Sequence, residues 1–356
     1  YFYNMPTWTR KIGQGPSEQG WYRQAKLLTL IAKADADCCT TTTTTTTEPP
    51  PAGPLRMTFI GEGTPATPVA DPADVTQWNT FFDLPANGTP FTSVIVGVVF
   101  IPDYGYEVQL WGGAGITTKD SLFDTDNAGV YLTSVIDDAE CIVATGFDSF
   151  GDDQDGGCYR LLTVSLPALV TAGTQSFYNA LLVTSFNLPA MTTAMTYSFS
   201  GCSAVTSFSF PALVTAGVNV FRGCIGVTSF NLPSLTSEVG GSFSLLPSIV
   251  SFSLPALVTA GVGCFLGCPL ATSFSLPALI TTGFECFKSC TSATTFYLPL
   301  CTDLGGTVGD NNVFNNILGN TITLTIPASR MTCDAGSPDG DIVYLQANNT
   351  VTVIQT

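Results

Sequence analysis

Seven prolines recur at a fixed 22-residue step: Pro167, Pro189, Pro211, Pro233, Pro255, Pro277 and Pro299. A column of phenylalanines keeps the same step: Phe177, Phe199, Phe221, Phe243, Phe265 and Phe287. A single globular core gives no reason for such a period. A solenoid does, because each turn is one supersecondary unit stacked on a copy of itself. We therefore predict a mainly β repeat solenoid in which each 22-residue unit forms one coil.

The solenoid extends beyond the regular repeats. Steps of 27 residues lead from Phe177 back to Phe150 and Phe123, and from Phe287 forward to Phe314. Around Phe150 the extra residues lie in "GDDQDGGC", which brings Cys158 into the column of Cys202, Cys224, Cys268 and Cys290. Stacked repeats tolerate loop insertions that preserve the register of the core, so we expect about nine coils between residues 115 and 330.

The unit at 251–272, "SFSLPALVTAGVGCFLGCPLAT", indicates how one coil is built. A short strand places Phe252 and Leu254, two residues apart, on the inner face. Pro255 ends that strand because it lacks the N–H that a longer ladder needs. Gly261 is expected to permit a tight bend. The remaining inner positions are predicted to be Leu257, Ala260, Phe265 and Cys268.

The segments before the solenoid differ from it in composition. Residues 1–37 include a stretch with helical spacing, formed by Trp21, Ala25, Leu28 and Ala32. We expect this segment to mediate assembly, since an isolated helix of this length is marginal. Residues 38–54 contain "CCTTTTTTTTEPPP" and read as an extended Thr/Pro-rich linker.

Residues 55–114 are predicted to form a small β subdomain that caps the first coil. The strand-like runs are 55–63, 75–82, 91–101 and 106–113, separated by Gly and Pro. Such a cap would cover apolar faces that an exposed first coil leaves open. Residues 331–356 are the expected C-terminal cap.

Charge is scarce and unevenly placed. The net charge is −16, yet across residues 161–302 the only charged residues are Arg222, Glu238, Glu285 and Lys288. Nucleic acid and anionic lipid both select basic surfaces, so neither is an expected partner. No run approaches the ~20 apolar residues of a membrane span.

The repeated frame S-F-x-L-P-A-L-V-T-A-G-x-x-x-F-x-x-C resembles the BspA-like (Treponema pallidum-type) leucine-rich repeat, most closely at 210–230, "FPALVTAGVNVFRGCIGVTSF". The unit around Pro233 departs from it by lacking the Cys. The resemblance implies a non-catalytic solenoid that acts in adhesion and carries no catalytic residues to transfer. Segments 19–32 and 319–354 resemble bacteriophage structural proteins.

Most catalytic and metal-binding sites need residues that this sequence lacks. The chain contains no histidine, which excludes Ser-His-Asp and Cys-His catalysis and histidine zinc sites. Cys264, Cys268, Cys286 and Cys290 repeat a C-x3-C pair at the 22-residue step. Buried core thiols are the favoured interpretation over zinc or disulfides, because free Cys is often buried. The adjacent Cys38 and Cys39 could form an intermolecular bridge.

The densest polar cluster is an acidic loop formed by Asp148, Asp152, Asp153 and Asp155. Carboxylate oxygens on a Gly-rich loop suit Ca²⁺, so calcium is the one cofactor considered. Paired acids could also serve a polysaccharide-cleaving enzyme. A solvated insertion is the third interpretation. Candidate glycosylation sites are Asn87 and Asn348 and the threonines Thr40, Thr41, Thr42, Thr43, Thr44, Thr45, Thr46 and Thr47.

Together these features predict a non-enzymatic structural and adhesive protein, extracellular, on a cell surface or on a virion. Residues 1–37 would join copies into a homo-oligomer, filament, fibre or coat that displays the repeats to a glycan or protein ligand. The alternatives are a polysaccharide-cleaving solenoid enzyme and a monomeric adhesin. The Ser/Thr surface is too uniform to indicate which face binds.

Overall fold

The computed structural model describes residues 53–60, 69–99, 105–119, 122, 132–151, 158, 160–305, 313–331 and 339–356. The chain divides into two units, Tyr1–Pro51 and Ala52–Thr356, and the first lies outside the described residues. The second begins with β1 (Leu55–Ile60), α2 (Val75–Phe81), β2 (Ser93–Val99) and β3 (Gly105–Trp111). It ends with β21 (Thr321–Ile326), η3 (Ala328–Met331), α3 (Gly340–Asn348) and β22 (Thr350–Gln355). No helix in these ranges is long and apolar enough to cross a membrane.

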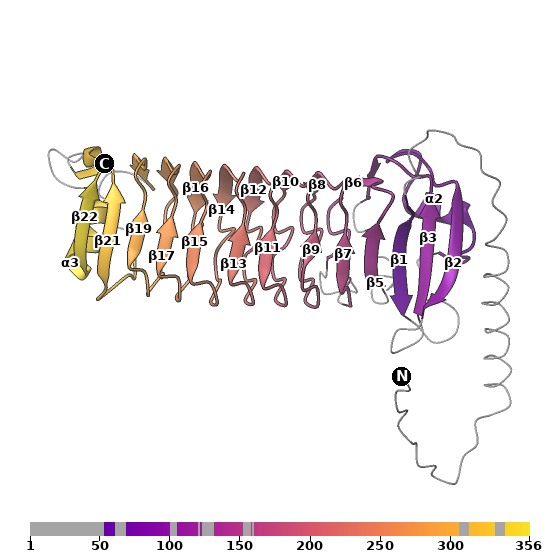
Figure 1. The fold of residues 1–356 in the computed structure, drawn as a ribbon, viewed down its shortest axis with the longest axis horizontal. Coiled ribbons are helices and arrows are strands. Elements are labelled where there is room, and N and C mark those ends of the chain that lie inside the picture. The colour runs from indigo at the N-terminus through magenta and orange to yellow at the C-terminus, as the bar shows by residue number, and fades with distance from the viewer. Residues whose placement is uncertain are drawn as a thin grey trace, which may run out of the picture. The chain divides into compact units, whose positions relative to one another are not determined.

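Between these ends, two rows of short strands run along a stack of coils (Figure 1). The odd-numbered row comprises β5 (Leu132–Asp137), β7 (Thr163–Ser165), β9 (Phe186–Asn187), β11 (Ser207–Ser209), β13 (Ser229–Asn231), β15 (Ser251–Ser253), β17 (Ser273–Ser275) and β19 (Thr295–Tyr297). The even-numbered row comprises β4 (Ile116–Thr117), β6 (Ile142–Ala144), β8 (Thr171–Ala172), β10 (Thr193–Ala194), β12 (Thr215–Val218), β14 (Ser237–Gly240), β16 (Thr259–Val262), β18 (Thr281–Thr282) and β20 (Asp303–Leu304).

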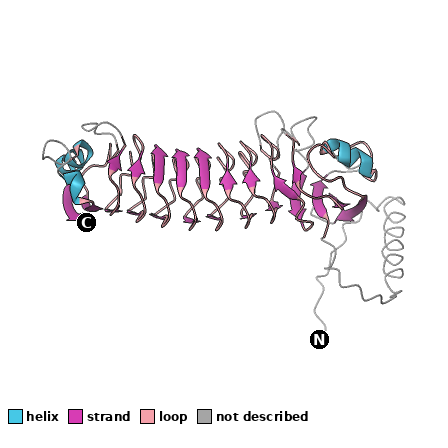
Figure 2. Cartoon of the chain, turned by 90° about the horizontal axis from the view of Figure 1, so that it is seen from above, coloured by secondary structure: helices cyan, strands magenta, loops and turns pink. Residues whose placement is uncertain are grey.

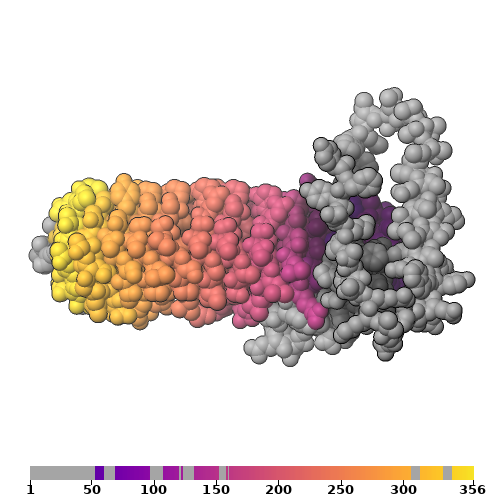
Figure 3. Space-filling model, turned by 60° about the horizontal axis from the view of Figure 1, so that its bottom comes forward, coloured from indigo at the N-terminus to yellow at the C-terminus, as the bar shows by residue number. Residues whose placement is uncertain are grey.

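Within each sheet of the two rows, neighbouring strands pair in parallel and in the register of the sequence repeat. Phe252 lies beside Phe274, and Ala194 beside Ala216, each 22 residues further along the chain. The even-numbered row is one sheet of nine strands, in agreement with the expected number of coils. In Figure 3 the coils appear as successive bands of surface from magenta to yellow. The predicted β repeat solenoid is confirmed.

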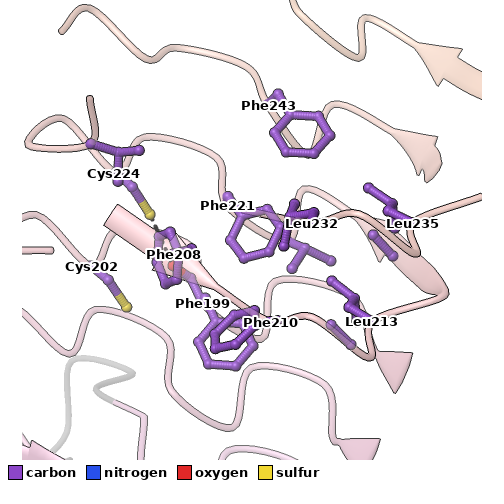
Figure 4. Close-up of a cluster of buried hydrophobic side chains, with 14 of the residues drawn as sticks. Phe199, Cys202, Phe208, Phe210, Leu213, Phe221, Cys224, Leu232, Leu235 and Phe243 are labelled. Atoms are coloured by element: carbon purple, nitrogen blue, oxygen red, sulfur yellow. Dashed lines mark hydrogen bonds between the residues drawn. The ribbon is translucent and has the colours of Figure 1, made fainter. Parts of the chain in front are cut away.

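Two interleaved columns of phenylalanine form the core. In one, Phe265 stacks on Phe243 and Phe287, with ring centroids 5.5 and 5.4 Å apart. The other column contributes Phe252 and Phe274, which meet Phe265 edge-on at 4.7 and 5.5 Å. Edge-to-face and offset contacts at these distances are favourable arrangements of aromatic quadrupoles. Figure 4 shows the same packing around Phe199, Phe208 and Phe221, beside a row of leucines and two cysteines.

The longer steps keep the column in register. Phe150 stacks on Phe177 at 5.5 Å, and Phe314 stacks on Phe287 at the same distance. The N–H of Cys158 donates to the carbonyl of Gly151 at 2.8 Å, which closes the base of the acidic insertion, and Cys158 is buried. The inserted residues therefore leave the core undisturbed. Phe123 lies outside the described residues.

Each proline starts a turn. The N–H of Leu257 donates to the carbonyl of Leu254 at 3.3 Å, which places Pro255 at the second position of a β-turn. Proline favours this position because its ring fixes φ near −65°. The same bond joins Leu279 to Leu276 across Pro277. Pro255 thus ends β15 as predicted.

The expected bend at Gly261 is wrong. Gly261 lies inside β16, and the left-handed residues of that coil are Gly263 (φ 61°) and Gly267 (φ 70°). Glycine is needed at 261 for another reason, because a Cβ there would lie 1.8 Å from the carbonyl oxygen of Val239 on the preceding coil. Neighbouring coils therefore leave no room for a side chain at this position.

The expected strand at 75–82 is also wrong, because this run forms the helix α2. Asp74 caps the helix, and its carboxylate accepts hydrogen bonds from the backbone N–H and the hydroxyl of Thr76, which lower the pKa of Asp74. Trp78 and Phe81 lie three residues apart and are both buried. Capping and burial of one helical face outweigh the β propensity of these residues.

The other predicted strands of the 55–114 segment form. β1 pairs antiparallel with both β3 and β5, and β5 pairs in parallel with β7. One sheet therefore runs from the cap into the first coils.

Gly261→Ala is expected to lower the free energy of unfolding by about 1–3 kcal/mol, since the added methyl group overpacks a close backbone contact. Val239 occupies the same column one coil earlier and is 61% exposed, so Val239→Ala is the matched control. Urea denaturation of both variants measures the difference. Equal unfolding midpoints would contradict the close-approach explanation.

Candidate functional site

The outward side chains of the odd-numbered row form two columns of hydroxyl and amide groups. One column runs through Thr163, Ser185, Ser207, Ser229, Ser251, Ser273 and Thr295, and the other through Ser165, Asn187, Ser209, Asn231, Ser253, Ser275 and Tyr297. Neighbouring coils place equivalent groups about 4.8 Å apart, and the two columns lie about 6.6 Å apart along each strand. This face presents a regular array of uncharged hydrogen-bonding groups.

The array is interrupted after each asparagine. β9 ends its sheet and β11 begins another, and likewise β13 and β15 are not paired within the described stack. The side-chain amide of Asn187 donates to the hydroxyl of Ser165 at 2.8 Å, and that of Asn231 to the hydroxyl of Ser209 at 2.9 Å. Both asparagines therefore bond backward to the preceding coil on the side away from the break. These breaks were not predicted from the sequence, although an asparagine replaces serine in this column just before each of them.

A hollow of about 470 Å³ lies over the first break. Its polar lining includes Thr163, Ser165, Thr184, Ser185, Asn187 and Ser209, and its apolar lining includes Leu162, Phe186, Pro189 and Pro211. Phe186 is only partly buried, and Leu162 is 52% exposed. The hollow combines hydroxyl groups with apolar surface and has no charged residue among those that line it.

The few charged groups of the repeats do not alter this neutral surface. Glu285 and Lys288 form an ion pair with each other, and Glu238 is 1% exposed. The carboxylate of Glu238 accepts hydrogen bonds from the N–H groups of Ser242 at 2.8 Å and Gly261 at 3.0 Å. Burial raises the pKa of Glu238. Glu238 replaces a core alanine and supports its own coil and the next.

The cysteines of the repeats are buried, as predicted, and those at 202, 224, 264, 268, 286, 290 and 301 are free thiols. The thiols of Cys202, Cys224, Cys268 and Cys290 each donate to the carbonyl of the core phenylalanine one coil earlier, at 3.3, 3.1, 3.0 and 3.2 Å. Burial raises the pKa values of Cys202, Cys264 and Cys290 well above that of a free thiol, and that of Cys301 to about 12. Neutral thiols of this kind pack as small core residues and are poor nucleophiles.

Of the acidic loop, only Asp148 is described, and it is 3% exposed. Its N–H donates to the carbonyl of Thr174 at 2.9 Å, and its carboxylate lies against Gly151. Asp152, Asp153 and Asp155 lie outside the described residues. Within the described ranges, no three His, Cys, Asp or Glu side chains gather as a metal site would require. The calcium site remains a prediction.

The other predicted sites fall in two groups. Trp21, Ala25, Leu28, Ala32, Cys38, Cys39 and Thr40 to Thr47 lie outside the described residues. Asn87 is partly buried and its amide donates to Asp83 at 3.3 Å, whereas Asn348 is exposed at the end of α3. Glycosylation at both asparagines stays a prediction.

The Glu238→Gln variant tests the buried carboxyl. The pKa of Glu238 is raised by folding, so its stabilising contribution is complete below its ordinary pKa of 4.5 and is lost as pH rises through the folded value. Glutamine does not titrate. The free energy of unfolding of the variant, relative to the natural protein, should therefore increase between pH 4 and pH 8. Parallel pH profiles of the two proteins in urea titrations would contradict a raised pKa of the buried Glu238 carboxyl.

The family comparison agrees with this architecture. The family described as "BspA type Leucine rich repeat region" matches residues 142–244 and 217–333, with six copies. No curated protein matches the chain. The leucine-rich repeat protein of T. pallidum is 20% identical, over 50% of this chain and 82% of that chain, with a TM-score of 0.42. A leucine-rich repeat protein of Bacteroides ovatus is 15% identical, over 73% of this chain and 68% of that chain, with a TM-score of 0.46.

A leucine rich cell surface protein of Faecalibacterium prausnitzii is 14% identical, over 74% of this chain and 87% of that chain, with a TM-score of 0.33. None of these comparisons bears on the resemblance to bacteriophage structural proteins, which stays a prediction. The family match spans more than half of the chain, and its repeats coincide with the stacked coils. This chain is a member of the BspA-type leucine-rich repeat family.

Proposed function

We propose that this protein is a non-enzymatic binding protein, displayed outside a cell or virion, that holds a neutral glycan in the hollow over the break between β9 and β11. The observation that carries the proposal is the lining of that hollow, in which hydroxyl and amide groups surround partly exposed apolar side chains without any charge. Membership of a family of surface repeat proteins supports a binding role over catalysis.

The chemistry of the hollow suits a sugar. Hydroxyls of Thr163 and Ser185 and the amide of Asn187 can exchange hydrogen bonds with sugar hydroxyls, since each offers both donor and acceptor capacity. The exposed parts of Phe186 and Leu162 suit the C–H surfaces of a pyranose ring. The repeat of hydroxyls at about 4.8 Å beyond the hollow would let a longer chain continue along the coils.

Charged ligands fit this surface poorly. Among the described residues of 161–302, Arg222 is exposed, Glu285 and Lys288 pair with each other and Glu238 is buried, so these groups form no cluster that could neutralise phosphate or sulfate groups. Recognition of an acidic polymer needs such a cluster. A neutral ligand avoids the desolvation cost that an unpaired charge would impose.

Residues 1–37 provide the second part of the proposal. We assign them the role of joining copies into a homo-oligomer or filament that displays the repeats, because Trp21, Ala25, Leu28 and Ala32 recur at helical spacing in the sequence. The Thr/Pro-rich linker at 38–54 would separate this assembly segment from the displayed body.

Asn187→Ala should weaken binding of neutral oligosaccharides by about 3- to 10-fold, because it removes a hydrogen-bonding group from the hollow. Ser275 occupies the same column outside the hollow, so Ser275→Ala is the matched control. Isothermal titration against a panel of neutral and acidic oligosaccharides measures both. The proposal would be contradicted if no neutral oligosaccharide binds, or if the two variants lose the same amount of affinity.

Deletion of residues 1–37 should remove the assembly contacts that this segment makes, and so reduce the size of the assemblies, while leaving the solenoid folded. Electron microscopy and sedimentation of the full-length and shortened proteins measure assembly, and far-ultraviolet circular dichroism checks the fold. Monodisperse particles in both samples would indicate a monomeric adhesin.

A further inference from the structure

The two ends of the stack have covered cores and open sheet edges. At one end α2 buries Trp78 and Phe81, and at the other α3 buries Ile342 and Leu345. The outermost strands, β2 and β22, each pair with a single neighbour among the described residues, β3 and β21 respectively. Figures 1 and 2 show these strands and helices at opposite ends of the coils.

Neither edge carries the features that usually prevent pairing. β2 reads SVIVGVV and β22 reads TVTVIQ, so both lack charge and proline. Proteins commonly protect exposed edges with lysine, proline or very short strands. The outward side chains Ile95 and Ile354 are 54% and 49% exposed. Long, uncharged and partly apolar edges are templates for another strand.

The backbone of β22 has hydrogen-bonding groups that point away from β21. The N–H groups of Thr350 and Thr356 donate toward β21, to Asn320 at 2.9 Å and Ile326 at 3.2 Å. Successive residues of a strand alternate the direction of their backbone groups. Val351, Val353 and Gln355 therefore direct their N–H and carbonyl groups toward the open edge.

The two edges match in direction and in side-chain pattern. β2 runs antiparallel to β3, β3 to β1, and β1 to β5, whereas β5 runs in the direction of the repeats and β22 is parallel to β21. β2 and β22 therefore run in opposite directions. Val94 and Val96 of β2 and Val351 and Val353 of β22 all pack against the core. An antiparallel pair would thus continue the inner apolar row without changing its face.

We infer that β22 of one copy pairs antiparallel with β2 of a second copy, so that the solenoids join end to end in an open fibre. A contact between unlike surfaces repeats without closing, as a heterologous interface does. This arrangement satisfies both edges of every copy with one kind of contact, whereas pairing of β22 with β22 leaves β2 open. The contact uses neither residues 1–37 nor the hollow, so it extends the proposed function without resting on it.

Charge substitutions in the full chain test this contact. Ile354→Lys or Ile95→Glu alone should abolish end-to-end fibres, because each places a charge in an apolar strand pair. In the register that places Ile95 opposite Ile354, the double variant Ile95→Glu with Ile354→Lys should restore the fibres, since opposite charges then face each other across the contact. Val250→Lys is the control, because Val250 is 54% exposed in the middle of the stack and should not affect assembly.

Sedimentation velocity and electron microscopy distinguish the outcomes. Loss of the fibres in both single variants and their recovery in the double variant would support the contact. Continued loss in the double variant indicates pairing of like edges, which overturns it. Monomers of the natural protein at every concentration also overturn it. Fibres that survive both single substitutions but disappear without residues 1–37 would overturn it while supporting the assembly segment of the proposed function.

Discussion

The in-register stacking of two phenylalanine columns is the interaction on which the rest of this structure depends. Each ring of one column lies between rings of the other, as Phe265 does between Phe252 and Phe274. A buried aromatic side chain contributes more apolar area than most core residues, and each contact here repeats once per coil. The register therefore cannot slip by one residue without turning the whole column outward. The prolines, the cysteines and the paired strands all follow from that fixed period.

The same constraint produces the surface of the molecule. Identical positions of successive coils are neighbours, so a charge repeated in the sequence would become a column of like charges. Serine and threonine avoid that repulsion, which explains why the repeats are nearly free of charge. The consequence for function is a neutral, hydroxyl-rich face, and the asparagines at 187 and 231 mark where its sheet is interrupted.

The period made much of the fold predictable from sequence. The columns, the longer steps to Phe150 and Phe314, the turns at proline and the burial of the cysteines could all be derived from spacing. The helix at α2 could not, because its residues favour strands and only the cap at Asp74 and the burial of Trp78 decide otherwise. Nor could the role of Gly261, since a close approach between coils leaves no local signal. The hollow could not be predicted either, because asparagine replaces serine at both 187 and 231 and the sequence does not show that the sheet is interrupted there.

Insertion of one more coil tests the central claim most directly. A copy of residues 251–272 placed after Thr272 should stack in register and keep a cooperative unfolding transition with the circular dichroism of a folded solenoid. The same insertion shortened by three residues should disrupt the columns and broaden or abolish the transition. Thermal unfolding of the two proteins would measure this. Equal tolerance of both insertions would contradict the claim that the register of the phenylalanine columns determines the fold.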